Sequence, residues 1–320
     1  MIIHTSENAI SRLPQVQLDS SFPARDVVHM ILAGGPTQTL YNLSTGERQR
    51  AVDFLCREAG VIEEDTQGVR FQMDTERLNE SLGVFAVSGV HFRGTPIVTT
   101  RGNEGTLEDL ADSAKKSFQD DPREKSWSLM LFSVYPGLTS EWVNEKGEMQ
   151  SVERILQAEC AKKYGKGHCF GTHRLEGISF AVRRFCLEQD VEPSQLEGVW
   201  LEAYQYILGA VESIKKTQRD DGSLQRCWFR KQTFPATPLE WRETLKQVGS
   251  FKRRDESLVY ATGHCLDSIS SLAEFLRDDH EWMQNACYIL AQTIETRWTA
   301  IGRKIGPLTH AIHALKLLDV

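Results

Sequence analysis

Apolar residues recur every three or four positions along most of the chain, which is the period of an amphipathic helix. The pattern at 24–35 stops at two glycines, and the pattern at 45–60 runs from the N-cap candidate Thr45 to Gly60. The other helices that this period predicts cover 104–118, 126–137, 151–165, 170–189, 194–217, 239–249, 262–277, 280–298 and 307–318. We therefore expect an all-α chain.

Two stretches interrupt the helical pattern. Residues 83–102 are rich in Val, Phe and Thr with Gly and Pro between them, which predicts a small β-hairpin. Residues 230–256 are polar and charged and contain two prolines, which indicates an insertion or lid between core helices. No low-complexity linker divides the chain, so residues 1–320 are expected to form one domain.

A histidine stands near the start of three of the apolar patterns. His173, His264 and His310 share the pattern His-x-(Leu/Ile)-(Glu/Asp/His), with separations of 91 and 46 residues. Because 91 is nearly twice 46, a fourth helix start is expected between the first two, and a new apolar pattern begins at 223–224. The repeating unit is then a pair of helices, one facing a common centre and one outside. The predicted inner helices are 172–186, 224–230, 262–277 and 308–318, and the outer ones are 194–217, 239–249 and 280–298.

A turn between two of these helices carries a known motif. Gln218, Asp221, Gly222 and Ser223 resemble the Gln-x-x-Asp-Gly-Ser turn of the prenyltransferase and squalene-cyclase repeat, although Trp228 comes later than the aromatic residue of that repeat. The resemblance is strongest over about 169–320. It implies an α/α-toroid of about six helical hairpins, in which inner and outer helices alternate around a ring.

The resemblance also implies several chemistries. Protein prenyltransferases and lanthionine cyclases carry zinc at the mouth of such a ring, but the Cys-His-Gly signature of the cyclases is reversed here at 263–265. Toroidal polysaccharide lyases and glycosidases use Tyr, His and carboxylate groups. A class II terpene cyclase needs an Asp-x-Asp-Asp acid, and the nearest candidate, Asp220-Asp221, belongs to the turn motif.

The repeated histidines are the candidate site. In a ring of helices, residues at the first turn of each inner helix face one axis, where the positive helix ends favour anions. Residues three apart share a helix face, which pairs His173 with Glu176, His264 with Asp267, and His310 with His313. We expect the first histidine of each pair at the cavity mouth, with the two carboxylates one turn deeper.

Three interpretations of these residues remain open. In the first, Cys169, His173, His264 and His310 hold Zn²⁺, and a carboxylate orients the imidazoles. In the second, the histidines and carboxylates, assisted by Tyr260, transfer protons on an isoprenoid or carbohydrate ligand. In the third, the protein is a non-catalytic binding or structural toroid, and each histidine is a packing residue.

Composition argues against nucleic acid as a partner and against a membrane-spanning segment. The formal net charge is −7, and Lys and Arg are dispersed among acidic residues, so no basic stripe for nucleic acid exists. No apolar run is long enough to span a bilayer. The N-terminal segment lacks a signal-peptide pattern, which favours the cytoplasm, with an exported domain whose signal segment has been removed as the alternative. Seven cysteines without a CxxC pair indicate reduced thiols rather than a disulfide framework.

Overall fold

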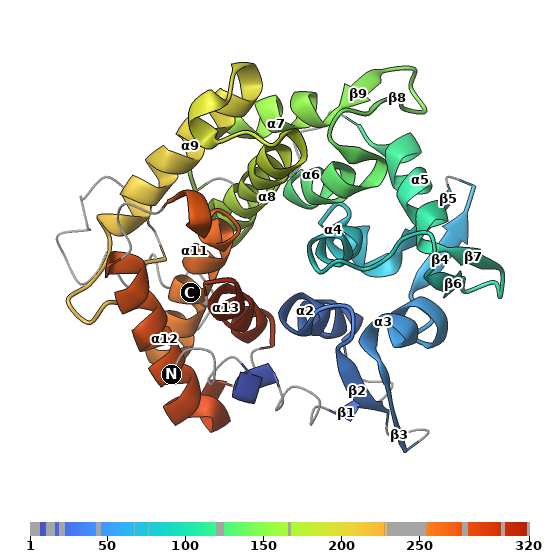
Figure 1. Ribbon diagram of the computed structural model, residues 1–320. Coiled ribbons are helices and arrows are strands. Elements are labelled where there is room, and N and C mark those ends of the chain that lie inside the picture. The colour runs from blue at the N-terminus through green and yellow to red at the C-terminus, as the bar shows by residue number, and fades with distance from the viewer. Residues whose placement is uncertain are drawn as a thin grey trace, which may run out of the picture.

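The computed structural model (Figure 1) is mostly helical, with small strand pairs at its periphery. The residues that it describes are 7–10, 17–18, 23–42, 46–66, 68–75, 77–119, 125–165, 168–226, 228, 254–276, 281–301 and 305–318. None of the helices among these residues combines the length and the apolarity that a bilayer span requires. The six cysteines in this part of the chain form no disulfide.

Within the described residues, six helices contact one another in a closed cycle. Each of the six packs against the next member of this group in chain order, and the last packs against the first. The six therefore surround a common axis (Figure 1). In order they are α2 (Ala24–Gly34), α4 (Glu80–Val87), α6 (Ser126–Phe132), α8 (Thr172–Gln189), α11 (Arg254–Ser270) and α13 (Ile305–Leu317).

Other helices lie outside this cycle. In Figure 1 these are α3 (Ala51–Asp53) with the π-helical turn Phe54–Glu58, α5 (Leu107–Ser117), α7 (Val152–Cys160), α9 (Gly198–Lys215) and α12 (Glu281–Ile301). Burial separates the two groups. Every residue of α6 is buried, whereas α9 buries one stripe at helical spacing from Trp200 to Ile214. Helix α6 is thus covered on all sides, and α9 only on its inward face.

The predicted hairpin at 83–102 is partly wrong. Residues up to Val87 belong to α4, and the hairpin lies further on, as β6 (Pro96–Val98) paired antiparallel with β7 (Glu104–Thr106). The reason is burial: the segment from Val84 to Ala86 lies within the cycle, and a short apolar run suits a buried helix as well as a strand.

Other short strands were missed in the N-terminal half. Antiparallel pairs form between β2 (Thr39–Asn42) and β3 (Glu47–Arg50), β4 (Ile62–Asp65) and β5 (Gly68–Phe71), and β8 (Glu141–Val143) and β9 (Met149–Ser151). A two-residue β1 (Gln17–Leu18) adds a parallel neighbour to β2. The helix predicted for 45–60 accordingly starts only at Ala51. Several of these pairs link an inner helix to the next outer one, as β8 and β9 link α6 to α7.

The predicted equivalence of the three histidines is wrong. His173 lies in the first turn of α8, but His310 lies in the second turn of α13 and His264 in the third turn of α11. Helix α11 begins at Arg254, within the segment predicted as an insertion, and residues 224–226, predicted to start an inner helix, are not helical. The rest of that predicted insertion, 230–253, and the predicted outer helix 239–249 lie outside the described residues.

The turn after α9 joins two outer helices. The Gln218 side-chain amide donates to the carbonyls of Gly222 (2.9 Å) and Trp282 (2.7 Å), the second of which lies in the first turn of α12. Asp221 Oδ1 accepts from the backbone N–H and the hydroxyl of Ser223, at 3.0 and 2.6 Å. Gly222 has a positive φ of 86°, which suits glycine. Each residue of the motif therefore has a structural role in this turn.

Glycines allow the inner helices to approach closely. A Cβ on Gly177 of α8 would lie 2.8 Å from the Ser126 carbonyl oxygen of α6. A Cβ on Gly263 of α11 would lie 2.8 Å from Cβ of Ala311 on α13. Both distances are shorter than van der Waals contact, so these two helix pairs can keep their spacing only with glycine at these positions.

Replacing either glycine with alanine tests this packing. Gly177→Ala and Gly263→Ala should each lower the free energy of unfolding by about 1 to 3 kcal/mol, because overpacking outweighs the helix propensity gained. Gly94→Ala is the control, since nothing lies within 4 Å of the Cβ that alanine would add there and Gly94 is outside the helices. Denaturant unfolding measures all three. Unchanged stability in the first two variants would contradict the close approach.

A buried carboxyl in the 3-10 turn Gln72–Thr75, before α4, makes stability depend on pH. Burial raises the pKa of Asp74 to about 7, against the lowering effect of hydrogen bonds from the Ser81 N–H (3.0 Å) and hydroxyl (2.7 Å). The unfolded chain ionises Asp74 near its ordinary pKa, so between about 4 and 7 folding takes up a proton. Stability from this group is present at low pH and is lost as the pH rises through about 7.

Asp74→Asn should therefore stabilise the protein at high pH only. The amide oxygen can accept both Ser81 hydrogen bonds without a charge. The variant should equal the wild type near pH 4 and exceed it by about 2 to 4 kcal/mol at pH 8. Unfolding free energies across this range measure the difference, with the exposed Asp190→Asn as the control. A difference that does not change with pH would contradict the assignment.

Candidate functional site

Imidazole side chains fill the axis of the helix cycle. The rings of His173, His264 and His310 have centroids 5.7, 5.2 and 4.2 Å apart, and their side chains are nearly inaccessible to solvent. The structure thus brings together the three histidines that the sequence singled out. His29 of α2 lies edge-on to His310 at 5.2 Å, and Trp127 of α6 lies 5.0 Å from His173.

His29 was missed because it lies in the N-terminal half, outside the repeat. Its Nε2 is 3.8 Å from the buried carboxylate of Glu80 on α4, which also pairs with Arg25 and Arg77. All six helices of the cycle thus send polar or aromatic groups to the axis. One signal was visible in the sequence, because His29 interrupts an otherwise apolar and fully buried run of α2.

Asp267 joins two of the axial helices. Its carboxylate accepts hydrogen bonds from Nδ1 of His310 (2.6 Å) and Nδ1 of His313 (2.7 Å), so α11 and α13 share one buried anion. An ionised carboxylate only accepts, so both histidines carry a proton on Nδ1. The same holds for His264, whose Nδ1 donates to the Tyr260 carbonyl at 2.9 Å.

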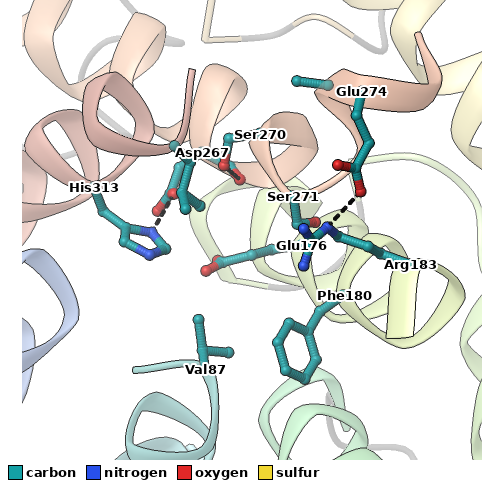
Figure 2. A pocket seen from close by; sticks show the side chains of 11 residues that line it. Val87, Glu176, Phe180, Arg183, Asp267, Ser270, Ser271, Glu274 and His313 are labelled. Atoms are coloured by element: carbon teal, nitrogen blue, oxygen red, sulfur yellow. Dashed lines mark hydrogen bonds and ion pairs between the residues drawn. The ribbon is translucent and has the colours of Figure 1, made fainter. Parts of the chain in front are cut away.

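An open pocket of about 720 Å³ lies over the carboxylates of Asp267 and Glu176 (Figure 2). Figure 2 shows the Glu176 carboxylate pointing toward His313 and Asp267, and Arg183 paired with Glu274 at 2.9 Å. The lining consists of Val87, Glu176, Phe180, Arg183, Asp267, Ser270, Ser271, Ala273, Glu274, His313 and Leu317. Most of these side chains are polar, and three are carboxylates.

The position of this pocket corrects the predicted geometry. Its lining comes from the later turns of α8, α11 and α13 and from the last residue of α4, not from the helix starts. Glu176 and Asp267 line the pocket, while His173, His264 and His310 are buried beneath it, which reverses the expected order. The carbonyl ends of helices carry partial negative charge, so this pocket favours cations or neutral groups rather than the expected anions.

Tyr260 and Cys169 lie away from the pocket. The Tyr260 ring stacks on His264 at 4.4 Å, and its hydroxyl is hydrogen-bonded to Cys169 and Arg226. Cys169 and Phe170 have left-handed backbone angles, with φ of 47° and 59°, immediately before α8. Arg226 lies over the rings of Phe170 and Tyr260 at 4.5 and 4.4 Å. Tyr260, predicted as a catalytic group, therefore does not line the pocket.

Burial and neighbouring charges shift the pKa values of the side chains on the axis. Desolvation, and then the charge of neighbouring histidines, lowers the pKa of His29, His173 and His264 well below its usual range, so these rings are neutral at pH 7. Burial raises the pKa of Asp267, but His313 and His310 lower it by more, so its carboxyl group remains ionised. Burial first, and then Cys169, raises the pKa of Tyr260, which keeps its hydroxyl protonated.

Possible metal ligands fall into three overlapping sets among the described residues. Within each set, the donor atoms lie within 4.8 Å of one another. The sets are Cys169, His173 and His264; His173, Glu176 and His310; and Glu176, Asp267 and His313. The predicted four-ligand site is thus divided, because His310 groups with Glu176 rather than with Cys169. The first set offers sulfur and nitrogen donors, and the third is mainly carboxylate, so the two suit different metals.

No known protein family, curated protein or solved structure matches this chain. A function for the chain must therefore be argued from the chemistry of the site itself.

Asp267→Asn tests the shared anion. An amide offers one acceptor and one donor in place of two acceptors, so it cannot satisfy both Nδ1–H groups. The variant should unfold with a free energy lower by about 2 to 4 kcal/mol, because a buried hydrogen-bonded charge is lost. The control is Asp255→Asn on the same helix, where the pair with Arg297 is long (3.6 Å) and exposed, and we expect a change below about 1 kcal/mol.

Nitrogen NMR of the imidazoles gives a second readout of the same variant. In the wild type, His310 and His313 should both be Nδ1-protonated tautomers. In Asp267→Asn, one of them should change tautomer or lose its hydrogen bond. Identical imidazole spectra in the two proteins would contradict the bridging role of Asp267.

Proposed function

We propose that this chain is an α/α-toroid whose axial pocket binds a carbohydrate and cleaves its glycosidic bond. Two features support the toroid. The six inner helices contact one another in a closed cycle with further helices outside. In addition, each residue of the Gln-Asp-Gly-Ser motif has a role in the turn that ties α9 to α12.

One observation carries the catalytic part of the proposal. A buried carboxylate, Asp267, holds His313 by Nδ1 at 2.7 Å, at the edge of an open pocket and within 4.8 Å of Glu176. An acceptor on Nδ1 fixes the tautomer and directs the basic Nε2 away from the carboxylate, as a general base requires. Glu176 supplies a second proton-transfer group on the facing helix.

The two groups have complementary roles in hydrolysis. His313 Nε2 acts as the proton acceptor, and Glu176 acts as the proton donor to the departing glycosidic oxygen. Both oxygens of Asp267 are engaged by imidazoles, so it acts as a positioning residue for His313 and not as a nucleophile. Phe180, on the pocket wall, offers an apolar face on which a sugar ring can pack.

The lining suits a sugar ring, which has polar edges and an apolar face. Carboxylates and serines lie beside apolar surface from Val87, Phe180 and Leu317. Three carboxylates face one arginine, which is itself paired with Glu274. The ligand is therefore a neutral or amino carbohydrate rather than an acidic one.

One observation favours a non-catalytic alternative. The histidines of the axis are buried, and two of them share hydrogen bonds with Asp267, which would also serve to hold α11 and α13 together. In that case the pocket binds a ligand or a peptide without chemistry, and the imidazoles are packing residues.

Oligosaccharide cleavage tests the proposal. Purified protein is incubated with neutral glucans and mannans, and with chitin and chitosan oligomers, and new reducing ends are measured. At least one substrate should be cleaved, and His313→Gln and Glu176→Gln should each lower the rate by about 100-fold or more. The matched controls His91→Gln, at an exposed position, and Glu188→Gln, on the same helix as Glu176, should retain the activity.

Three outcomes would each contradict a different part of the proposal. Binding without cleavage would support the non-catalytic alternative, and full activity in both pocket variants would exclude the assigned roles. Neither binding nor cleavage of any oligosaccharide in the panel would reject the carbohydrate ligand itself.

A further inference from the structure

We propose that Cys169, His173 and His264 form a divalent transition-metal site, and that the metal is zinc. One sulfur and two imidazole donors suit this ion, and their donor atoms lie within 4.8 Å of one another. The site lies at the start of α8, whereas the pocket is lined by later turns of that helix. It uses none of the groups assigned roles in carbohydrate cleavage, so either proposal can fail without the other.

The first argument is that an imidazole is buried without hydrogen bonds. Neither ring nitrogen of His173 has a hydrogen-bond partner among the described residues, although the side chain is 1% exposed. A buried nitrogen left without a partner is unfavourable. A metal ion bound to one nitrogen removes that cost, whereas packing alone does not explain a polar ring at this position.

The second argument is that His264 is already oriented as a ligand. Its Nδ1–H donates to the Tyr260 carbonyl one turn earlier on α11, at 2.9 Å, and a carbonyl can only accept. The lone pair therefore lies on Nε2. A backbone or carboxylate acceptor on the far nitrogen is the usual support for a metal-binding histidine.

The third argument is backbone strain at the sulfur ligand. Cys169 and Phe170 are both left-handed, and Gly171 follows with φ of 78°, so three consecutive residues share this conformation. For residues with a side chain this conformation is unfavourable. Strain of this kind persists where a site needs a particular geometry. Here it brings the Cys169 thiol to His173 and His264.

Cys169 also has a polar neighbour on α11. The Tyr260 hydroxyl is hydrogen-bonded to Cys169, and the Arg226 guanidinium lies over the Tyr260 ring at 4.4 Å. Cys169 is only half-buried, so the metal can be reached from solvent.

The geometry leaves a coordination position open. Donor atoms around tetrahedral zinc are about 3.5 Å apart, so donors within 4.8 Å of one another need to approach by about 1.3 Å at most. Three protein ligands leave the fourth position for water, as in catalytic zinc sites. The His310 ring lies 4.2 Å from that of His264, and its Nε2 has no hydrogen-bond partner among the described residues.

Cobalt substitution tests the site directly. The full chain is reduced, stripped of metal with EDTA and titrated with Co²⁺, followed by Zn²⁺. We expect one Co²⁺ per chain, a near-ultraviolet charge-transfer band from sulfur to cobalt, visible bands of a four-coordinate ion, and loss of both on adding Zn²⁺. Cys169→Ser should remove the charge-transfer band. His173→Ala and His264→Ala should weaken binding by about 100-fold or more.

Matched controls separate this site from the other donor sets. Cys160→Ser changes another half-buried thiol and should leave the spectrum unchanged, as should the exposed His91→Ala. Circular dichroism checks that each variant is folded. If a histidine variant does not fold, the conservative variant Cys169→Ser still decides whether the site binds the metal. Absence of stoichiometric binding by the wild type overturns the proposal. So does a spectrum that is unchanged in Cys169→Ser, or binding abolished only by Glu176→Gln.

Discussion

The carboxylate of Asp267 is the interaction on which the arrangement of the axis depends. It is almost completely buried and accepts two short hydrogen bonds from imidazoles of one neighbouring helix. A buried anion without such partners would be very unfavourable, so α11 cannot shift against α13 without a large loss of stability. The same carboxylate determines which nitrogen of His310 and His313 carries the proton. Packing, protonation and the direction of the basic lone pairs thus have one origin.

The polar axis lies inside an apolar core, and this arrangement has further consequences. The apolar core lies between inner and outer helices, where buried Leu, Ile and Val side chains dominate. The interior of the cycle is narrow, since Gly177 and Gly263 allow their helices to meet at backbone distance. Several imidazole nitrogens on the axis have no partner among the described residues. Such groups are costly in a packed interior, and their concentration at one place is the strongest sign that it binds something.

The two ends of the axis differ in chemistry. Toward the pocket, carboxylates and a histidine lie near the negative ends of the helices, which favours water, hydroxyl groups and cations. Toward the start of α8, a thiol, two imidazoles and an arginine gather around a strained turn. His310 lies between them, with Nδ1 on Asp267 and its ring close to His264. The His310 ring therefore contacts both ends of the axis, so a change in structure at one end can alter the other through this ring.

The sequence by itself determined the helical class of the chain and the residues most worth examining. Helical periodicity reads the local burial pattern directly, so most helices of the C-terminal half were placed correctly, α8 and α13 among them. The hairpins of the N-terminal half were mostly missed, because strands of three or four residues leave too short a pattern. The shared pattern around His173, His264 and His310 identified these residues, but for a reason that was wrong, since they lie at different turns of their helices.

Tertiary structure alone decided what these residues form. His29 and Glu80 join the axis only because the first inner helices pack against the last ones, and no local pattern encodes that contact. Helix direction and packing decide at which end of the helices the pocket lies. They also decide that carboxylates line the pocket and that histidines are buried beneath it. The division of the ligands into sets depends on side-chain distances of a few ångströms, which follow from how six helices close on one another and not from spacing along the chain.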